Sequence, residues 1–402
     1  MIWEELNQRG LINQSSSEDL KNILKPGTSF YIGFDPTASS LQLGNLLPFI
    51  TYIRLEKAGL QGICLVGGMT GLIGDPSGRN KERELSDFSL IKKRSILFEK
   101  QIKRFLKNPK IVNNFSWFKD FKYFEFLRDV GKHFNVGPML SKEYIKSRLQ
   151  TGLSYAEFSY SLIQAYDFYF LNKKHNCILQ VGGSDQWGNM VSGIDLIKSK
   201  ANKEAFVFTL PLLVDTNGKK LSKSFNNSVW LDEKLSSAYE FYQYFINIPD
   251  ELIIQWFKYF SFKSLQEIKE IEKEHLMAPE NRVAQKLLAQ EMTLFVHKEK
   301  GLLQAEKITK SLFENDISKL SKDDFKAMES SLEVIKIKSN LKISDILSLT
   351  DLSKRQIRQD IQNNAISVNG KTINDDILIK NFIFNKYLLV KRGKKTYFLV
   401  VK

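Results

Sequence analysis

The sequence is poor in the residues that build metal sites and disulfides. Its 402 residues include two cysteines and four histidines. The cysteines, Cys64 and Cys177, are too few for a framework of several disulfides or for a cysteine-rich zinc site. The histidines are scattered, and none has the spacing of a metal-binding motif. We therefore expect no protein-bound metal.

Long apolar runs are also missing. No stretch approaches the roughly 20 apolar residues that a membrane-spanning helix needs. Residues 1–6 contain two acids and lack the apolar segment of a signal peptide. These features predict a cytoplasmic protein without a membrane partner.

Two common phosphate-binding motifs, Gly-x-Gly-x-x-Gly and the Gly-Lys-Ser/Thr loop, are absent too. Instead, residues 29–34 read as an apolar strand, followed by a Gly/Pro/Ser turn and a helix over 46–58. A helix N-terminus binds anions through its free N–H groups and its dipole. Residues 62–68 read as a second buried strand, so the order predicts a parallel sheet with ligands at the carboxyl ends of its strands.

Apolar and basic residues are abundant. Apolar residues make up 43% of the chain, and its length predicts two or three domains. The net charge is +14, and residues 331–402 hold 14 Lys/Arg against 6 Asp/Glu, a net +8. A lysine-rich composition with solvated faces is one interpretation. The concentration of charge in the last fifth favours a nucleic-acid partner.

Several polar residues follow predicted strands or share a helix face. Asp75 lies in the loop after the second strand, as a crevice ligand or as a turn residue before proline. Asp185 follows a strand over 176–181, as a ribose ligand or an N-cap. On the helix over 154–167, three residues at i, i+4 and i+7 line either a polar pocket or a solvated face: Tyr160, Gln164 and Asp167.

A basic loop follows the strand region 206–214. Its lysines, Lys220 and Lys223, stand beside serines and either close over phosphates or form an ordinary surface loop. Arg79 and Arg83 can reach the same crevice.

The chain divides into four predicted segments. Residues 1–228 form an α/β domain with an insertion at about 90–150, and 229–318 form an all-α domain. Residues 319–338 are a polar linker. Residues 339–402 form a small α+β domain, in which a helix over 353–361 and a hairpin over 391–395 present basic residues suited to RNA phosphates.

Five motifs carry a resemblance to a known family: Tyr-Ile-Gly-Phe-Asp-Pro-Thr-Ala at 31–38, Leu-Ile-Gly-Asp-Pro-Ser-Gly at 72–78, Glu-Phe-Ser-Tyr at 157–160, Gly-Gly-Ser-Asp-Gln-Trp-Gly-Asn at 182–189 and Lys-Leu-Ser-Lys-Ser at 220–224. In this order and spacing they resemble the bacterial-type tyrosyl-tRNA synthetases, which are class I aminoacyl-tRNA synthetases. The resemblance implies a Rossmann-like parallel-sheet catalytic domain, an all-α domain and an S4-like RNA-binding domain. It also implies an enzyme that activates L-tyrosine with Mg²⁺-ATP and transfers the tyrosyl group to tRNA(Tyr).

The resemblance assigns roles to individual residues. Tyrosine would be bound by Tyr31, Asp75, Tyr160, Gln164, Asp167, Gln180 and Gln186. ATP would be bound by Gly33, Asp35, Gly44, Asp185, Lys220 and Lys223. The catalytic residues would be Thr37, Gln42, Asn45, Arg79, Arg83, Lys220 and Lys223. The tRNA would be bound by Lys354, Arg355, Arg358, Arg392, Lys394 and Lys395.

One family signature is altered. Where the family has His-Ile-Gly-His, residues 42–45 read Gln-Leu-Gly-Asn, so that Gln42 offers an amide donor that never becomes cationic. A tryptophanyl-tRNA synthetase and a non-catalytic RNA-binding relative are the two alternatives. The family also implies a homodimer, with residues 120–132 as the interface.

Overall fold

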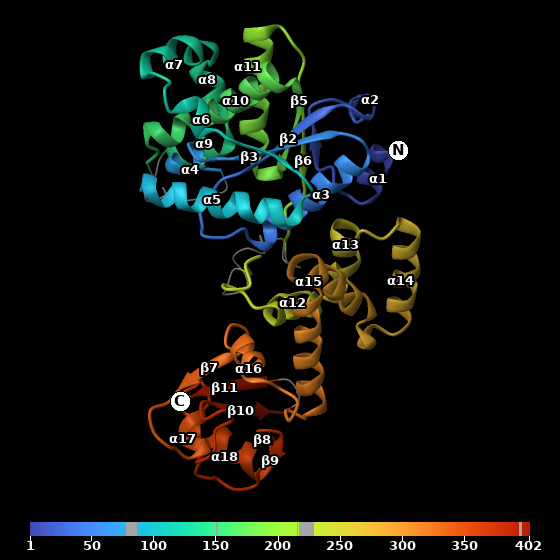
Figure 1. Ribbon diagram of the computed structural model, residues 1–402, viewed down its shortest axis with the longest axis vertical. Helices are drawn as coiled ribbons and strands as arrows, with labels where there is room; N and C mark the ends of the chain where they lie inside the picture. Colours follow the sequence, from blue (N-terminus) through green and yellow to red (C-terminus); the bar gives the residue numbers. More distant parts are fainter. Residues whose placement is uncertain (78–86, 150–151, 215, 217–228, 394–395) are drawn as a thin grey trace. The chain divides into compact units, whose positions relative to one another are not determined.

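The computed structural model describes residues 1–77, 87–149, 152–214, 216, 229–393 and 396–402 (Figure 1). The chain forms two compact units. The first contains Met1–Leu231 and Pro249–Ala284, and the second contains Asp232–Ile248 and Gln285–Lys402. Among the described residues, no helix is both long and apolar enough to cross a membrane.

The first unit is built on a six-stranded sheet with the order β1-β6-β5-β2-β3-β4. The strands are β1 (Gln14–Ser15), β2 (Ser29–Phe34), β3 (Gln61–Val66), β4 (Lys110–Asn113), β5 (Cys177–Gly183) and β6 (Phe206–Leu210). All neighbouring pairs are parallel except β1 with β6. The predicted parallel α/β sheet is thus confirmed. The chain leaves β2 toward β3 on one side and later adds β5 on the other, which makes the carboxyl ends of these strands the expected ligand position.

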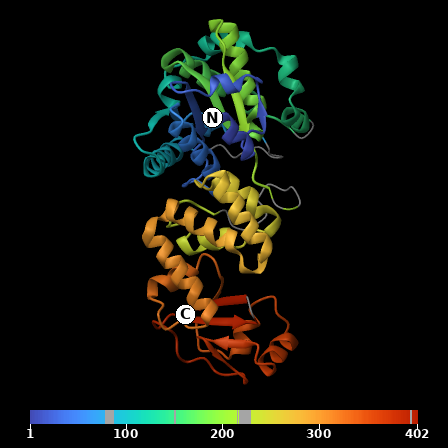
Figure 2. The same cartoon turned by 90° about the vertical axis from the view of Figure 1, so that its right-hand side faces the viewer.

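Helices cover both faces of this sheet (Figure 2). On one face, the side chains of β2 pack against α3 (Leu46–Lys57), where Phe34 stacks on Phe49 with ring centroids 4.6 Å apart. Phe49 in turn contacts Phe105 of α5 (Phe88–Phe105). On the other face, α10 (Tyr155–His175) and α11 (Trp187–Ala201) close a core that includes Tyr31 and Phe168.

The remaining helical elements of the first unit are α1 (Ile2–Gln8), α2 (Leu20–Ile23), η1 (Leu43–Asn45), α4 (Thr70–Ile73), α6 (Phe115–Phe118), α7 (Tyr123–Asp129), η2 (Gly131–His133), α8 (Val136–Ser141), α9 (Glu143–Leu149), η3 (Ser184–Gln186), α13 (Asp250–Phe260), α14 (Leu265–Met277) and η5 (Pro279–Asn281). The expected insertion at about 90–150 differs from the structure in its first part. There, α5 packs against β3 and β4 extends the sheet, because together they form an ordinary crossover. Within the expected insertion, the described segment after β4 is the part that adds no strand to the sheet.

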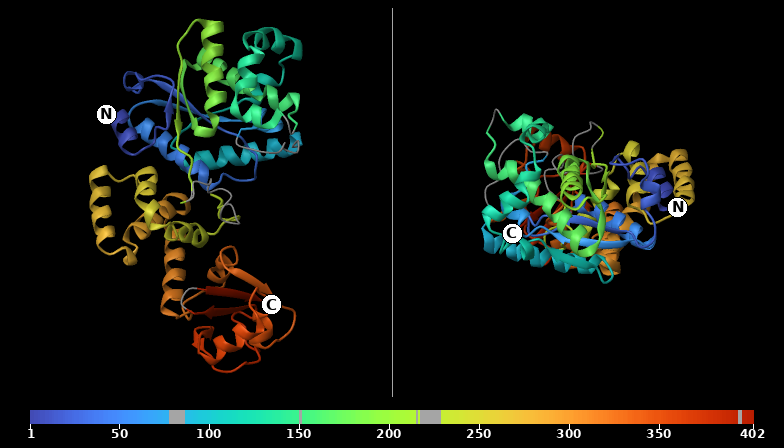
Figure 3. Two further views of the ribbon diagram at one scale, coloured as in Figure 1. Left: turned by 180° about the vertical axis from the view of Figure 1, so that it is seen from behind. Right: turned by 90° about the horizontal axis from the view of Figure 1, so that it is seen from above.

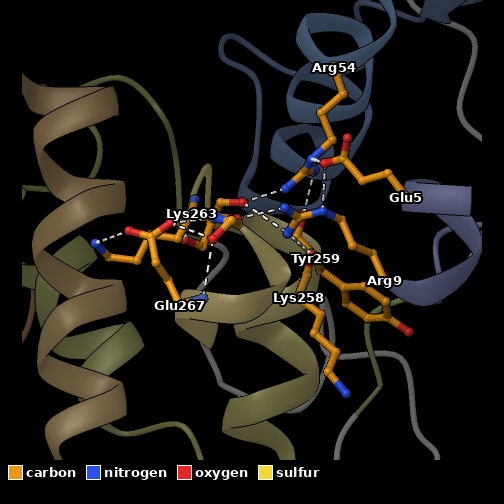
Figure 4. A network of polar contacts seen from close by, with 9 residues as sticks. Glu5, Arg9, Arg54, Lys258, Tyr259, Lys263 and Glu267 are labelled. Carbon is orange, nitrogen blue, oxygen red and sulfur yellow. Dashed lines mark hydrogen bonds and ion pairs between the residues drawn. The ribbon is translucent and has the colours of Figure 1, made fainter. Parts of the chain in front are cut away.

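Two buried arginines attach α13 to the sheet domain (Figure 4). Arg9, which follows α1, donates to the carbonyl oxygens of Lys258 and Lys263 at 3.1 and 2.6 Å. Arg54 of α3 donates to the carbonyl oxygen of Tyr259 at 2.8 Å. The Glu5 carboxylate accepts from Arg9 Nε at 2.8 Å. The guanidinium groups therefore pair with carbonyl oxygens at the end of α13 and just after it, where backbone acceptors lack a partner within the helix.

The second unit combines helices with a five-stranded sheet of order β7-β11-β10-β8-β9 (Figure 3). Its strands are β7 (Glu333–Lys336), β8 (Ile366–Val368), β9 (Lys371–Thr372), β10 (Tyr387–Arg392) and β11 (Thr396–Val401). Its helices are α12 (Ala238–Ile246), α15 (Val283–Glu314), α16 (Lys322–Met328), α17 (Ile343–Leu347) and α18 (Lys354–Gln362). Apolar residues of α17 and α18 share one core with the strands.

The structure differs from two expected domain boundaries. Residues 319–338, expected as a linker, contain α16 and β7, and β7 pairs in parallel with β11. Helices follow residue 236, as expected for the all-α segment, but α13 and α14 belong to the first unit and α12 belongs to the second. Polar composition alone did not reveal these long-range contacts.

Candidate active site

Polar residues gather where β2, β3 and β5 end. They come from the loops that follow these strands, from the segment after β4 and from α10. The side chain of Asp35, just after β2, accepts hydrogen bonds from Tyr160 Oη at 2.7 Å and Thr70 Oγ1 at 2.6 Å. Gly67 is required beside it, because a Cβ at that position would collide with Asp35 Oδ1. Burial, and then the charge of Asp35, raises the pKa of Tyr160 well above its usual value.

Asp167 is a buried carboxylate held by two donors. Its side chain is 1% exposed and accepts from Asn114 Nδ2 at 3.0 Å and Trp117 Nε1 at 2.9 Å. Burial raises the pKa of Asp167 well above its usual value, and these two hydrogen bonds oppose the rise. A free acceptor position on such a group favours a neutral donor such as a hydroxyl.

Tyr31 lies close to this carboxylate. Burial, and then the charge of Asp167, raises the pKa of Tyr31 well above its usual value. The Tyr31 hydroxyl is buried and has no hydrogen-bond partner in the described part of the chain. Gln180 of β5 stands in register with Tyr31 and is 5% exposed. Because buried hydroxyl groups are nearly always paired, this arrangement suits a ligand that supplies the missing partner.

Asp75 belongs to a second polar cluster, which also contains Ser77, Gln186 and Asn189. Its carboxylate accepts from Gln186 Nε2, from the Ser77 N–H at 2.9 Å and from Asn189 Nδ2 at 3.3 Å. Burial raises the pKa of Asp75, and the hydrogen bonds from Ser77 and Gln186 oppose this effect. Asp75 also raises the pKa of Tyr160 through its charge, so both clusters belong to one site.

The altered signature forms a tight turn before α3. Asn45 Oδ1 accepts from the Gln42 N–H at 2.9 Å, and the Asn45 N–H donates to the Gln42 carbonyl at 2.8 Å. This bond uses the oxygen of the Asn45 amide and leaves its Nδ2 as the donor for a ligand. Gly44 is exposed beside it, and Thr37 is half-buried.

The structure thus brings most of the expected first-unit residues to one edge of the sheet. Gln164 is half-buried on α10, Asp185 lies in η3, and Gly33 is exposed near the end of β2. Four expected residues, Arg79, Arg83, Lys220 and Lys223, lie outside the described residues.

Sequence reasoning missed several residues of the site: Thr70, Ser77, Asn114, Trp117 and Asn189. Asn114 and Trp117 follow β4, an edge strand that was not recognised. The polar residues that directly follow β4 were the signal in the sequence that could have revealed this part of the site.

The expected tRNA-binding residues lie in the second unit. Lys354, Arg355 and Arg358 are exposed on α18. Arg392 differs, since its Nε donates to Asp360 Oδ2 at 2.6 Å. Lys394 and Lys395 lie outside the described residues.

Family models match nearly the whole chain. The model of "tRNA synthetases class I (W and Y)" matches residues 25–314, and that of the "Tyrosine--tRNA ligase SYY-like C-terminal domain" matches residues 322–400.

Known proteins agree with these matches. The tyrosine–tRNA ligase of Streptococcus mutans is 44% identical over 414 residues, covering 99% of each chain. That of Streptococcus suis is 43% identical and covers 98% of each chain. The C-terminally truncated mitochondrial tyrosyl-tRNA synthetase of Aspergillus nidulans has a TM-score of 0.71 at 31% identity, covering 78% of this chain and 94% of that one. The chain therefore belongs to the tyrosine–tRNA ligases, within the family of class I tRNA synthetases.

Proposed function

We propose that this tyrosine–tRNA ligase activates L-tyrosine where β2, β3 and β5 end, and that its C-terminal unit binds tRNA(Tyr). The tyrosine carboxylate attacks the α-phosphate of ATP, and the bond to pyrophosphate breaks. A hydroxyl of the terminal ribose of the tRNA then attacks the tyrosyl carbonyl, and AMP leaves. Both steps are promoted by placement of the substrates and by stabilisation of the charge that develops on the phosphates.

The buried pair of Tyr31 and Asp167 is the observation that carries the choice of tyrosine. The Tyr31 hydroxyl lacks a partner among the described residues, and Asp167 is fixed by two donors. A substrate phenol between them would donate to Asp167 and accept from Tyr31. Phenylalanine would leave these buried groups unpaired, which is worth on the order of 10⁴–10⁵ in discrimination.

The rest of the amino acid would lie toward Asp75. We assign the substrate ammonium to Asp75, Tyr160 and Gln164, and the substrate carboxylate to the neighbourhood of Gln186. Gln180 would line the same pocket beside Tyr31. The side chains of Asp75, Gln164 and Gln186 are half-buried at this edge of the sheet, and this supports the assignment.

ATP enters as its Mg²⁺ complex, a substrate rather than a resident cofactor. Asp35 and Asp185 would bind the adenylate, while Gly33 and Gly44 allow close approach of the backbone. Gln42, Asn45 and Thr37 would donate to the leaving pyrophosphate, aided by the cations expected from Arg79, Arg83, Lys220 and Lys223. The bond from the Gln42 N–H to Asn45 Oδ1 orients the Asn45 amide, and this supports its part in this role.

The partners are tRNA(Tyr) and a second copy of the chain. For the tRNA, the exposed cations of α18 supply a surface for phosphates. For the homodimer, α7 and the start of α8 expose apolar side chains, with Tyr123 58%, Phe124 81% and Val136 58% exposed. Exposed aromatic residues of this kind favour a protein interface near residues 120–132. We place the protein in the cytoplasm.

Exchange of pyrophosphate into ATP tests the assignment. We expect exchange that depends on tyrosine, together with charging of tRNA(Tyr). Exchange with tryptophan in place of tyrosine would select a tryptophanyl-tRNA synthetase. No exchange with tyrosine, from a folded protein that still binds RNA, would select the non-catalytic relative.

A further inference from the structure

Gln101 of α5 is a buried amide outside every motif of the site. Its side chain is 8% exposed, although it belongs to a helix with a charged outer face. Its Oε1 accepts from the Leu41 N–H at 2.9 Å, and its Nε2 donates to Ser40 Oγ at 3.0 Å. Ser40 and Leu41 are themselves 1% and 0% exposed. A helix on the face of the sheet thus holds the chain just before the altered signature.

The bonded segment leads directly into the phosphate side of the site. Ser40 Oγ donates to the Leu41 carbonyl at 2.9 Å, so the hydroxyl accepts from Gln101 and donates to the backbone at once. The turn that contains Gln42 and Asn45 begins at the next residue. Because the N–H of Leu41 and the hydroxyl of Ser40 are both buried, neither finds water if Gln101 is lost.

The same segment is held on its other edge by backbone. The Leu43 N–H donates to the Val229 carbonyl at 2.9 Å, and the Leu231 N–H donates to the Leu41 carbonyl at 2.9 Å. These two backbone bonds hold residues 41–43 against residues 229–231. Neither of them involves the Leu41 N–H. Gln101 supplies that partner through a side chain.

We propose that Gln101 is a positioning residue for the ATP half of the reaction. It fixes residues 40–41, and through them it sets where Gln42 and Asn45 meet the phosphates. The proposal rests on the function proposed above for Gln42 and Asn45. Tyrosine binding should be independent of Gln101, because no member of the Asp35, Asp75 or Asp167 clusters bonds to it among the described residues.

Replacement of Gln101 by methionine is the main test. Methionine keeps the length of the side chain and removes both hydrogen bonds. We expect the kcat/KM for ATP in tyrosine-dependent exchange to fall about ten- to hundredfold, since small displacements of reacting groups have effects of this size. The KM for tyrosine, and its Kd from equilibrium dialysis, should stay within about twofold.

Three further variants make the test specific. Gln101→Glu keeps the acceptor for the Leu41 N–H and loses only the donor to Ser40, so it should recover part of the loss. Ser40→Ala removes one of the two bonds and should give a smaller loss in the same direction, even if Gln101→Met fails to fold. Ser95→Ala is the matched control, because Ser95 lies on the same helix, is 4% exposed and has no hydrogen-bond partner in the described part of the chain.

The outcomes separate this proposal from the function on which it rests. Unchanged ATP kinetics in folded Gln101→Met and Ser40→Ala proteins would overturn it, and so would a Kd for tyrosine that is weakened as much as the kcat/KM for ATP. A wild-type protein without tyrosine-dependent exchange would instead overturn the proposed function. A selective loss for ATP, partly restored by glutamate and absent in Ser95→Ala, supports the positioning role.

Discussion

The hydroxyl of Tyr160 donates to the carboxylate of Asp35 across 2.7 Å, although 125 positions separate the two residues in the chain. Tyr160 comes from α10, on the side proposed for the amino acid, and Asp35 comes from the loop proposed for the adenylate. Thr70 supplies the second donor to Asp35. One carboxylate therefore joins the two halves of the proposed substrate site.

Removal of the Tyr160 hydroxyl should disturb both halves. In Tyr160→Phe, Asp35 keeps the hydrogen bond from Thr70 and loses the one from Tyr160. We expect kcat/KM to fall about tenfold or more for both tyrosine and ATP, because a charge-assisted hydrogen bond is lost. Steady-state exchange kinetics measure this. Tyr52→Phe, at another buried tyrosine, on α3, is the control. A loss confined to one substrate would contradict the joint role.

Trp117 should contribute to the choice of tyrosine over phenylalanine. Trp117→Phe removes one of the two donors to Asp167 and keeps an aromatic ring beside Phe170, where the present centroid distance is 4.3 Å. We expect kcat/KM for tyrosine to fall about tenfold with little change for phenylalanine, so discrimination shrinks. Exchange assays with each amino acid check this. The same change at the buried Trp256 should leave discrimination intact.

Asp75 should make stability depend on pH. Burial raises its pKa above the ordinary value of 3.8. The folded state therefore holds the proton more tightly than the unfolded chain, and the stability from this group is present below 3.8 and lost as the pH rises through the folded pKa.

Asp75→Asn removes this dependence. Relative to the variant, the wild type should lose Tm as the pH rises from about 4 to about 7, because only the wild type then buries a charge. The variant should also raise the KM for tyrosine about ten- to hundredfold, since the proposed partner of the ammonium group loses its charge. Thermal scans of both proteins at each pH give the difference. A Tm difference that stays constant with pH would contradict the assignment.

Gln42→His should be tolerated. The turn depends on the bond from the backbone N–H of residue 42 to Asn45 Oδ1, and histidine supplies the same N–H. We expect unchanged Tm and a change in the rate of tyrosine activation of no more than about tenfold, the lower end of typical acid–base and donor effects. Stopped-flow or exchange measurements of the rate of tyrosine activation test this expectation. A loss of several orders of magnitude would show that Gln42 is specifically adapted to this chain.

The sequence predicted the parts of the site that are local. Asp35 follows β2 directly, and Asp75 and Asp185 lie in the connections after β3 and β5, so the strand pattern was enough to place them at the sheet's edge. Asn114 and Trp117 donate to Asp167 because β4 pairs with β3 and because α10 brings Asp167 to the same place. No local pattern in the sequence encodes these long-range contacts.

The same reason explains the misplaced boundaries. β7 is short, with a charged residue at each end, and it becomes a strand because β11, more than 60 residues later, offers its edge. Likewise, α13 joins the first unit through Arg9 and Arg54, which donate there to backbone carbonyls. Backbone acceptors exist at every residue, so a sequence does not reveal which ones a buried arginine will use.

The contact between Gly370 and Asn315 ties the C-terminal sheet to the end of α15. Asn315 Nδ2 donates to the Gly370 carbonyl at 2.7 Å, and nearby Tyr397 Oη donates to the Leu312 carbonyl at 2.6 Å. Gly370 has φ +82°, and a Cβ there would lie 2.6 Å from the Asn315 carbonyl oxygen. Any larger residue at position 370 must therefore strain its backbone and push α15 and the sheet apart.

Gly370→Ala should weaken this junction by about 1–3 kcal/mol. We expect a lower Tm and a higher KM for tRNA in the charging reaction, with tyrosine-dependent exchange unchanged, because the exchange site lies in the other unit. Gly27→Ala is the matched control. Gly27 also has positive φ, +87°, but no described atom lies within 4 Å of the position of its Cβ, so it isolates backbone strain from the disturbed contact with Asn315. Equal effects of the two substitutions on tRNA charging would show that the contact with Asn315 does not support tRNA binding, whereas a loss specific to Gly370 would show that α15 and the C-terminal sheet must be joined to hold the tRNA.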